Sequence, residues 1–68
     1  MNQDYAEAMR WYRLAADQGH ATAQLKIGLL YASGKGVPLD VAEALRWLRK
    51  AEMNGSAPAR DWIKRLGG

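Results

Sequence analysis

His20 is the only histidine of the sequence, and it is the first candidate for proton transfer or metal binding because histidine commonly does both near neutral pH. The sequence contains no cysteine, and its carboxylates stand at expected helix starts or on expected solvated faces. No nucleophile is therefore paired with a base, and no set of metal ligands is spaced as a site requires. We expect no catalytic residue, no metal site and no cofactor, and we interpret His20 as an N-cap residue before a helix.

The segment GKG at residues 34–36 is a second candidate, because glycines beside a lysine can cradle a phosphate group. The phosphate-binding loop of nucleotide-hydrolysing enzymes needs a wider glycine spacing, a Ser or Thr after the lysine and a preceding strand. None of these is present in the sequence. With Pro38 close behind, the segment instead indicates a tight connector between two helices.

Five basic side chains at helical spacing could attract nucleic acid or an anionic surface. Acidic residues such as Glu7 and Glu43 interrupt them, and the formal net charge is only +3. Ion pairs three or four residues apart contribute only about 0.2–0.5 kcal/mol each, so the row indicates a solvated face. Charge-driven binding of nucleic acid or anionic surfaces remains the alternative function, and we do not expect nucleic acid to be the partner. The row consists of Arg10, Arg13, Arg46, Arg49 and Lys50.

The chain has 68 residues, enough for one small domain without support from disulfides or thiolate-bound metal. It contains no apolar run of about 18 residues and does not open with a signal-like segment, so we expect no membrane span. The absence of cysteine suits both the cytoplasm and the bacterial periplasm. We expect a soluble protein, with the cytoplasm favoured over the periplasm.

The elements that would position these residues repeat along the chain with a period of 36 residues. Of the 29 residues from 4 to 32, 13 are identical to the residue 36 positions later. Trp11 with Trp47 and Ile27 with Ile63 are examples. A period of this length is typical of stacked helical repeats, in which each unit buries its apolar face against its neighbours.

Capping residues predict where the first helix of each copy begins and ends. Asp4 and Asp40 stand at N-cap positions, each with a glutamate three residues later. Gly19 and Gly55 follow the last turn, where a left-handed residue is favoured. Apolar residues recur between these caps at steps of three and four, which predicts two amphipathic helices.

A further helix follows each of these, at residues 21–33 and at residues 57–66, with His20 and Ser56 as the expected N-caps. Gly28 is expected at a close contact between helices, where any side chain would clash. The predicted fold class is all-α, a short α–α superhelix (solenoid) of about four antiparallel helices joined by tight turns.

Three segments carry a resemblance to a known family. They are the helix motif A-x-A-Q-x-x-x-G-L-L-Y at residues 21–31, the turn G-K-G-V-P-x-D at residues 34–40 and the helix motif E-A-x-x-W at residues 43–47. Together they resemble the Sel-one-like repeat, a relative of the tetratricopeptide repeat, from Asp4 to about Ala59. The resemblance implies a right-handed superhelix of helix pairs with a concave surface for proteins or peptides. It also implies adaptor roles, in bacterial signalling, envelope and host-interaction systems and in eukaryotic membrane-protein quality control.

This resemblance predicts a non-enzymatic module that scaffolds contacts with a protein or peptide. Some cysteine-rich relatives are reported to act on β-lactams, but this chain has neither the cysteines nor a paired nucleophile and base. The resemblance places a binding groove along the second and fourth helices, where Lys26 and Arg65 would suit acidic groups or a terminal carboxylate. The side chains expected to face the groove are Thr22, Lys26, Leu29, Ser33, Trp62 and Arg65.

The resemblance also divides the single domain at residues 1–68 into three parts. Residues 4–19 would be an orphan second helix of a repeat, residues 20–55 a full repeat and residues 56–68 a C-terminal capping helix.

The two ends of the predicted stack differ in polarity. The fourth helix carries Asp61, Lys64 and Arg65 where the second helix has apolar or small residues, which predicts a polar outer face and a finished end. The first helix keeps its apolar residues, so we expect upstream repeats, a homodimer or a domain-swapped assembly to cover them. The residues expected to take part in self-association are Tyr5, Met9 and Tyr12.

The tryptophans are interpreted as packing residues, because Trp11, Trp47 and Trp62 each lie at the margin of an apolar arc. Leu14 is different, since it lies among polar residues and its counterpart in the second copy is Lys50. Leu14 is thus a candidate for an exposed contact point, with no role as the alternative.

Overall fold

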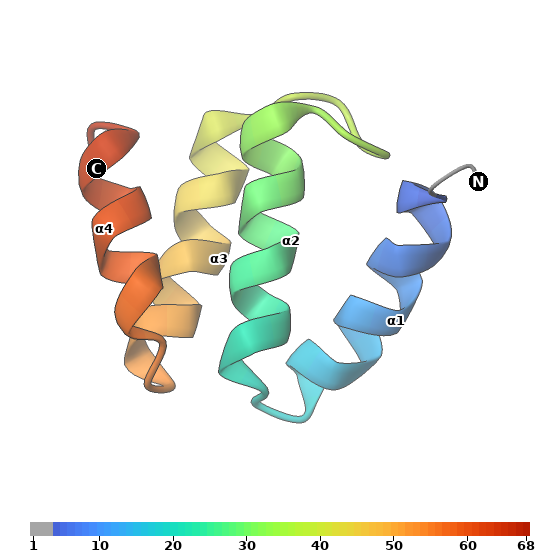
Figure 1. Cartoon of the computed structure of the whole chain (residues 1–68), viewed down its shortest axis with the longest axis horizontal. Helices are drawn as coiled ribbons and strands as arrows, with labels where there is room; N and C mark the ends of the chain where they lie inside the picture. Colours follow the sequence, from blue (N-terminus) through green and yellow to red (C-terminus); the bar gives the residue numbers. More distant parts are fainter. Residues whose placement is uncertain (1–3) are drawn as a thin grey trace.

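The computed structural model describes residues 4–68, and each secondary-structure element of that part is an α-helix. Successive helices run antiparallel (Figure 1), and a connector at residues 34–40 joins the second helix to the third. The prediction of an all-α, short helical solenoid is confirmed. The helices are α1 Tyr5–Asp17, α2 Ala21–Ser33, α3 Val41–Met53 and α4 Ala57–Arg65.

α1 and α3 begin at the two aspartates predicted from the sequence. Asp4 Oδ1 accepts a hydrogen bond from the backbone N–H of Glu7 at 3.0 Å, and Asp40 Oδ1 accepts one from the backbone N–H of Glu43 at 3.1 Å. Each bond satisfies one of the N–H groups that a helix start leaves without an intrahelical partner. The local sequence alone is sufficient to predict this feature.

The turns that follow α1 and α3 have the same geometry. Gly19 and Gly55 take positive φ values of 81° and 103°, as predicted for residues that end a helix. His20 and Ser56 then occupy the N-cap positions of α2 and α4, but neither side chain makes a capping hydrogen bond, so that part of the prediction is wrong. The turn itself holds these residues, because their backbone N–H groups donate to carbonyl oxygens five residues earlier, at 3.2 and 2.9 Å.

Removing the two kinds of N-cap should therefore affect stability differently. Asp40→Ala is expected to lower the free energy of unfolding by about 1 kcal/mol, because the Glu43 N–H loses its partner. Ser56→Ala is expected to change it by less than about 0.5 kcal/mol, because no capping bond is lost. Urea denaturation followed by circular dichroism measures both values, and equal losses would contradict the assignment of the caps.

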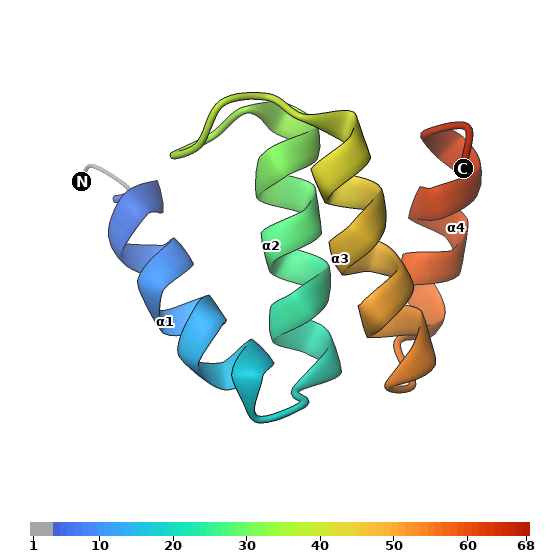
Figure 2. The same ribbon diagram turned by 180° about the vertical axis from the view of Figure 1, so that it is seen from behind.

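The helices follow one another in chain order across the molecule (Figures 1 and 2), and α2 and α3 make the most extensive contact. The two helices approach closely because Gly28 has no side chain. A Cβ atom at Gly28 would lie 2.8 Å from Leu48 Cγ and 3.1 Å from the carbonyl oxygen of Ala44. Leu48 and Ala44 are both 0% exposed, so neither has room to move away. The predicted role of Gly28 at a close helix contact is confirmed.

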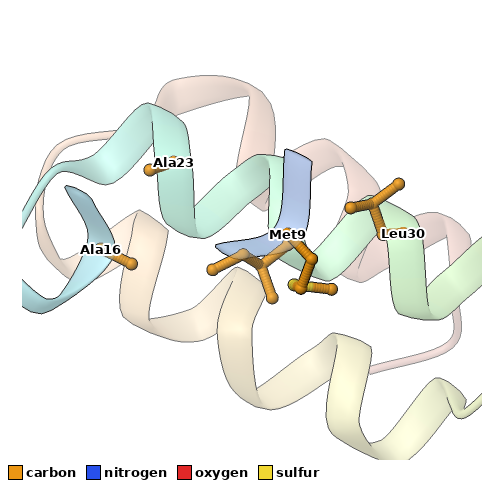
Figure 3. Packing of buried hydrophobic residues seen from close by; sticks show 5 residues of the cluster. Met9, Ala16, Ala23 and Leu30 are labelled. Carbon is orange, nitrogen blue, oxygen red and sulfur yellow. The ribbon is translucent and has the colours of Figure 1, made fainter. Parts of the chain in front are cut away.

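The buried apolar side chains form two clusters. The first joins α1 to α2 and contains Met9, Ala16, Ala23 and Leu30 (Figure 3) together with Ile27, which is 0% exposed. The second joins α3 to α4, and leucines of α2 also pack against it. Its buried members are Leu48, Ala51, Ala59 and Ile63.

Gln24 is a buried polar residue that connects three helices. Its side chain amide is 4% exposed and donates from Nε2 to the carbonyl oxygen of Ala16 at 3.1 Å, near the end of α1. Its Oε1 atom accepts a hydrogen bond from Nδ2 of Asn54, the C-cap residue of α3, at 2.9 Å. Because both polar atoms are paired, the cost of burying the amide is offset. Gln24 thereby ties the start of α2 to the ends of α1 and α3.

The three tryptophans do not all pack as predicted. Trp47 and Trp62 are partly buried and pack against the first and second clusters respectively, which confirms the prediction for these two. Trp11 is 65% exposed, so the prediction is wrong for this residue. The difference arises because α2 packs on α3, whereas no helix within residues 4–68 covers the corresponding face of α1.

Candidate functional site

A groove with a volume of about 280 Å³ lies between α1 and α2. The two helices diverge from the turn that joins them toward the N-terminal end of α1 (Figures 1 and 2), which makes room for the groove. Its walls are mostly apolar, with one acidic and one basic side chain. The lining residues are Asp4, Tyr5, Ala8 and Tyr12 on the side of α1, and Lys26, Leu29 and Leu30 on the side of α2.

The wall contributed by α1 is a stripe along one side of the helix. Tyr5, Ala8 and Tyr12 are three and four residues apart, so their side chains project in similar directions. Both tyrosines are partly buried against the first cluster, which fixes their rings and leaves part of each accessible. Ala8 lies between them in the stripe, and its small side chain keeps the groove open.

The connector at residues 34–40 packs against the start of α1. A Cβ atom at Gly36, whose φ is 75°, would lie 2.6 Å from Tyr5 Cβ and 3.1 Å from the backbone nitrogen of Ala6, so only glycine fits there. Lys35 Nζ lies 5.6 Å from the centroid of the Tyr5 ring, within the range of a cation–π contact. The connector therefore holds Tyr5 in place in the wall of the groove.

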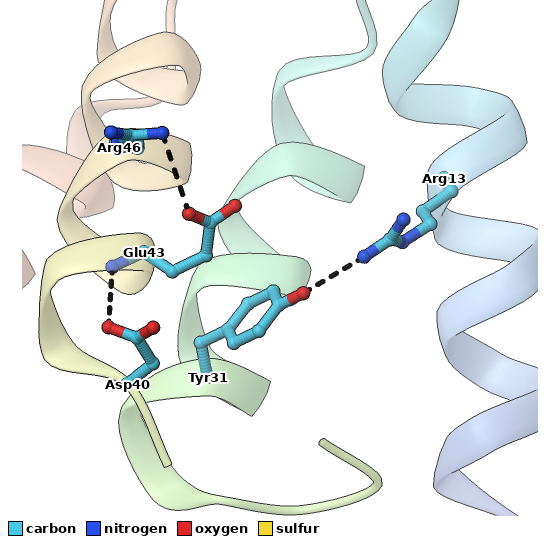
Figure 4. Close-up of polar contacts among 5 residues, drawn as sticks. All are labelled: Arg13, Tyr31, Asp40, Glu43 and Arg46. Carbon is cyan, nitrogen blue, oxygen red and sulfur yellow. Dashed lines mark hydrogen bonds and ion pairs between the residues drawn. The ribbon is translucent and has the colours of Figure 1, made fainter. Parts of the chain in front are cut away.

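A hydrogen bond between side chains also links the two helices that form the groove. Arg13 Nη2 on α1 donates to the Tyr31 hydroxyl oxygen on α2 at 2.9 Å (Figure 4). Neither residue lines the groove, so this bond fixes the position of α1 from outside it. Figure 4 also shows the Asp40 cap and the contact between Glu43 and Arg46, whose charged atoms are 3.8 Å apart on α3.

Two charged side chains give the groove an electrical polarity. Asp4 is the N-cap of α1, and Lys26 lies on the middle turn of α2. Both side chains are exposed, and Lys26 forms no salt bridge with any residue from 4 to 68. The ammonium group of Lys26 is therefore available to a negatively charged group bound beside the apolar wall.

Only some of the α2 residues predicted to face a partner line the groove. Lys26 and Leu29 line the groove, whereas Thr22 and Ser33 are exposed on the same helix outside it. The Ser33 hydroxyl group donates to the carbonyl oxygen of Leu29 at 2.8 Å, within its own helix. The Ser33 hydroxyl hydrogen is thus already engaged in a bond within α2. Two of the four residues predicted on α2 therefore line the groove.

The predicted partner-facing residues of α4 do not line the groove. Trp62 packs against the second cluster, and the guanidinium carbon of Arg65 lies 5.2 Å from the centroid of its ring. The structure therefore does not bring all six predicted residues into one cavity. A role for Trp62 and Arg65 in binding a partner stays a prediction.

The residues predicted for self-association are also separated. Tyr5 and Tyr12 line the groove, but Met9 is 5% exposed and belongs to the first cluster. The expectation of an uncovered apolar surface is wrong for Met9, because α2 covers it. Self-association stays a prediction, and Met9 has no free surface to contribute to it.

Sequence reasoning missed three lining residues: Asp4, Ala8 and Leu30. Ala8 could have been found, because it stands three residues after Tyr5 and four before Tyr12 on the same helical face. Leu30 could not, since its spacing indicates a core residue and it is indeed only 9% exposed. Asp4 was interpreted as a cap, which is correct and does not exclude a place at the rim of the groove.

The repeated helices match a known family. A model of the family described as Sel1 repeat matches residues 1–20 and residues 21–56. The chain belongs to the Sel1 repeat family. The resemblance inferred from the sequence motifs is thus confirmed. Sel1 repeats are in general protein–protein interaction modules built on a non-enzymatic helical scaffold.

No curated protein and no solved structure matches this Sel1 repeat chain. Over residues 4–68, no helix is both long enough and apolar enough to cross a membrane. In the same part of the chain, no three His, Asp or Glu side chains are grouped as a metal site would require.

Proposed function

We propose that this Sel1 repeat chain is a non-enzymatic protein–protein interaction module, and that its groove between α1 and α2 binds a segment of the partner protein. The observation that carries the proposal is the combination of a tyrosine-lined apolar wall with the exposed ammonium group of Lys26, which forms no salt bridge within residues 4–68. The partner segment would insert an apolar side chain and place a carboxylate near Lys26.

The apolar wall suits a side chain such as leucine or phenylalanine. The rings of Tyr5 and Tyr12 offer large surfaces whose positions are already fixed by packing, so little conformational entropy is lost when a partner binds. Leu29 and Leu30 provide the opposite wall. A volume of about 280 Å³ admits one or two such side chains rather than a folded domain.

The charges suggest which groups flank the apolar anchor of the partner segment. Lys26 would attract a carboxylate, whereas the Asp4 carboxylate would repel one and attract a basic group. A segment with a basic residue before its apolar anchor and an acidic residue after it, or the reverse order along the chain, would satisfy both ends. Arg65 cannot assist at this groove, because it lies over Trp62 on α4.

The peptide Lys-Ala-Leu-Leu-Ala-Glu, blocked at both ends, provides a test by NMR titration of the ¹⁵N-labelled chain. Lys26→Met keeps most of the apolar stem of the side chain and removes the charge, and it is expected to weaken binding about fivefold at low salt, as for an exposed ion pair. Lys64→Met, which removes a charge from α4, is the matched control and is expected to leave affinity unchanged. Arg65→Gln tests the prediction from the sequence that Arg65 contacts the partner. If the groove is the binding site, this variant should bind the peptide with unchanged affinity.

A second peptide, with glutamine in place of glutamate, completes a double-mutant cycle between Lys26 and the peptide's carboxylate. Replacing the glutamate should weaken binding to the parent chain and have no further effect on Lys26→Met, because the pair has already been lost. Equal losses for both chains would show that Lys26 is not the carboxylate's partner. The charge-driven alternative predicts instead that nucleic acid or an anionic surface binds, with an affinity that falls steeply with salt.

A further inference from the structure

Asn54 and Gly55 form the only Asn–Gly pair of the sequence, and the sequence contains no Asp–Gly pair. An Asn–Gly pair is chemically reactive, because glycine leaves its backbone nitrogen unhindered to attack the side-chain amide before it. Asparagine is a thermolabile residue for this reason. Asn54 is exposed, and a Cβ atom placed on Gly55 would have nothing within 4 Å, so the two reacting groups are open to water.

The reaction is a deamidation that needs no reactant other than water. The Gly55 nitrogen forms a bond to Asn54 Cγ, the bond from Cγ to Nδ2 breaks, and Nδ2 leaves as ammonia with the proton of the Gly55 N–H. Water then opens the resulting ring, either at Cγ to give aspartate or at the backbone carbonyl carbon to give isoaspartate, whose main chain runs through the side chain. A water molecule is consumed and ammonia is released, and nothing is oxidised or reduced.

The folded geometry holds the two reacting groups apart. Asn54 is the C-cap of α3 with ψ at 12°, which places the Gly55 nitrogen beside the backbone nitrogen of Asn54 and away from its Cβ. The Gly55 N–H also donates to the carbonyl oxygen of Glu52 at 3.1 Å. The leaving group, Nδ2 of Asn54, donates to Gln24 Oε1 at 2.9 Å. The turn and this side-chain bond must both open before the ring can close.

The equivalent turn after α1 shows which of these restraints is particular to Asn54. Gln18 is the C-cap there, with ψ at 7°, and the N–H of Gly19 donates to the carbonyl oxygen of Ala16 at 2.9 Å. The backbone restraint is therefore the same in both turns. Glutamine reacts far more slowly, because its longer side chain must form a larger ring. The bond from Asn54 to Gln24 has no counterpart at Gln18 within residues 4–68, so it is the restraint that distinguishes the two turns.

Conversion of Asn54 would break the junction that Gln24 forms between three helices. The start of α2 and the ends of α1 and α3 lie at the same end of the molecule (Figure 1). A carboxylate at position 54 would present an oxygen to Gln24 Oε1, so that two acceptors face each other. Turning the Gln24 amide over only moves the conflict, because Oε1 would then face the carbonyl oxygen of Ala16. The new negative charge would also lie at the C-terminal end of α3, where the helix dipole disfavours it.

We propose that Asn54 is a self-modification site, at which deamidation through Gly55 unties the end of α3 from α2, and that the bond to Gln24 sets the rate. The intact bond protects the amide that would leave. Its loss after conversion is permanent, because the ammonia has gone. The site is thus a covalent switch from a tied to a loosened junction. This inference goes beyond the proposed function and involves none of the residues that line the groove.

Mass spectrometry of the folded chain, aged at neutral pH, tests the site. Trypsin releases residues 51–60 as one peptide, in which conversion replaces the amide with an acid. We expect conversion to be confined to this peptide and to be slower than in the chain unfolded in guanidinium chloride. Gln18→Asn places a second Asn–Gly pair in the same molecule, so global unfolding affects both pairs equally. Position 18 should convert about fivefold faster than Asn54, the effect of one typical hydrogen bond on the population of the open form.

Thermal unfolding tests the consequence of conversion. Asn54→Asp copies one product and is expected to lower the Tm by several degrees. Gln18→Asp introduces the same charge at the C-cap of α1 and is the matched control, which should lower the Tm less because no contact with Gln24 is lost.

Equal Tm losses in these two variants would overturn the proposal. Equal conversion rates at the two positions of Gln18→Asn, or earlier conversion of another residue in the parent chain, would do the same. The proposal also fails if the folded chain stays unconverted over a period in which the chain in guanidinium chloride converts completely.

Discussion

Replacing Gly28 with leucine is expected to abolish or nearly abolish folding, with a loss of about 3 kcal/mol or more in the free energy of unfolding. A single Cβ atom at this position would already lie 2.8 Å from Leu48 Cγ. Leu48 is 0% exposed and cannot move without opening the contact between α2 and α3. A chain of 68 residues has a total stability of only roughly 3–10 kcal/mol, so the helices would have to separate.

Gly28→Ala and Thr22→Leu are the controls for this prediction. Alanine favours the helix by about 1 kcal/mol over glycine, so a net loss in Gly28→Ala means that the steric clash costs more than this gain. Thr22→Leu introduces leucine at an exposed position of the same helix and should change stability by less than about 0.5 kcal/mol. The double variant Gly28→Ala with Leu48→Ala should lose less than the sum of the single variants, because the smaller residue leaves room for the added methyl group.

Replacing Gln24 with leucine is expected to lower the free energy of unfolding by about 2–3 kcal/mol. The change removes both side-chain hydrogen bonds of Gln24, the one donated to the carbonyl oxygen of Ala16 and the one accepted from the side-chain amide of Asn54. The Ala16 carbonyl oxygen keeps its bond from the backbone N–H of Gly19, at 2.9 Å. Leucine is as apolar as the surroundings, so the loss measures the missing hydrogen bonds and not a mismatch of polarity. Urea denaturation of parent and variant gives the difference directly.

Asn54→Ala is the control for Gln24→Leu, because it removes one of the two hydrogen bonds from the exposed side. The loss is expected to be about 1 kcal/mol, smaller than in Gln24→Leu. The double variant should be little worse than Gln24→Leu alone, since the same bond cannot be lost twice. If Gln24→Leu were neutral, the buried amide would not be tying the three helices together.

The helix ends could be predicted from the sequence because their causes are local. Asp4 and Asp40 cap the helices through N–H groups only three residues away, and Gly19 and Gly55 end them through their own backbone conformation. The expected capping bond from the His20 side chain is absent, and the cause is again local. The preceding turn already fixes that residue through its backbone N–H, and a side-chain bond is not needed.

The exposure of Trp11 could not be predicted, because the environment of a tryptophan depends on distant parts of the chain. Trp11 and Trp47 have the same neighbours along the sequence in several positions, yet one is largely exposed and the other is packed against the first cluster. Only the order of the helices in space distinguishes them. The hydrogen bonds of Gln24 are a similar case, since its partner Asn54 is 30 residues away.

The groove was predicted only in fragments. Lys26 and Leu29 were assigned to partner binding, and Tyr5 and Tyr12 to self-association, but no sequence pattern indicates that the two pairs share one cavity. The two pairs share one cavity because α1 packs against α2 and diverges from it toward the start of α1. α4 packs on α3, at the other end of the row of helices from the groove (Figure 1), and Arg65 does not line the groove.

The claim that the groove between α1 and α2 is the partner site is tested most directly by NMR. Peptides that bind the ¹⁵N-labelled chain are selected from a random library, and the changes in its backbone amide shifts are mapped. We expect the selected peptides to share an apolar anchor next to an acidic residue, and the largest shifts to fall on residues 5–12 and 26–30. Shifts concentrated on α4 around Trp62, or a selected set dominated by basic residues without an apolar anchor, would contradict the assignment of the groove between α1 and α2 as the partner site.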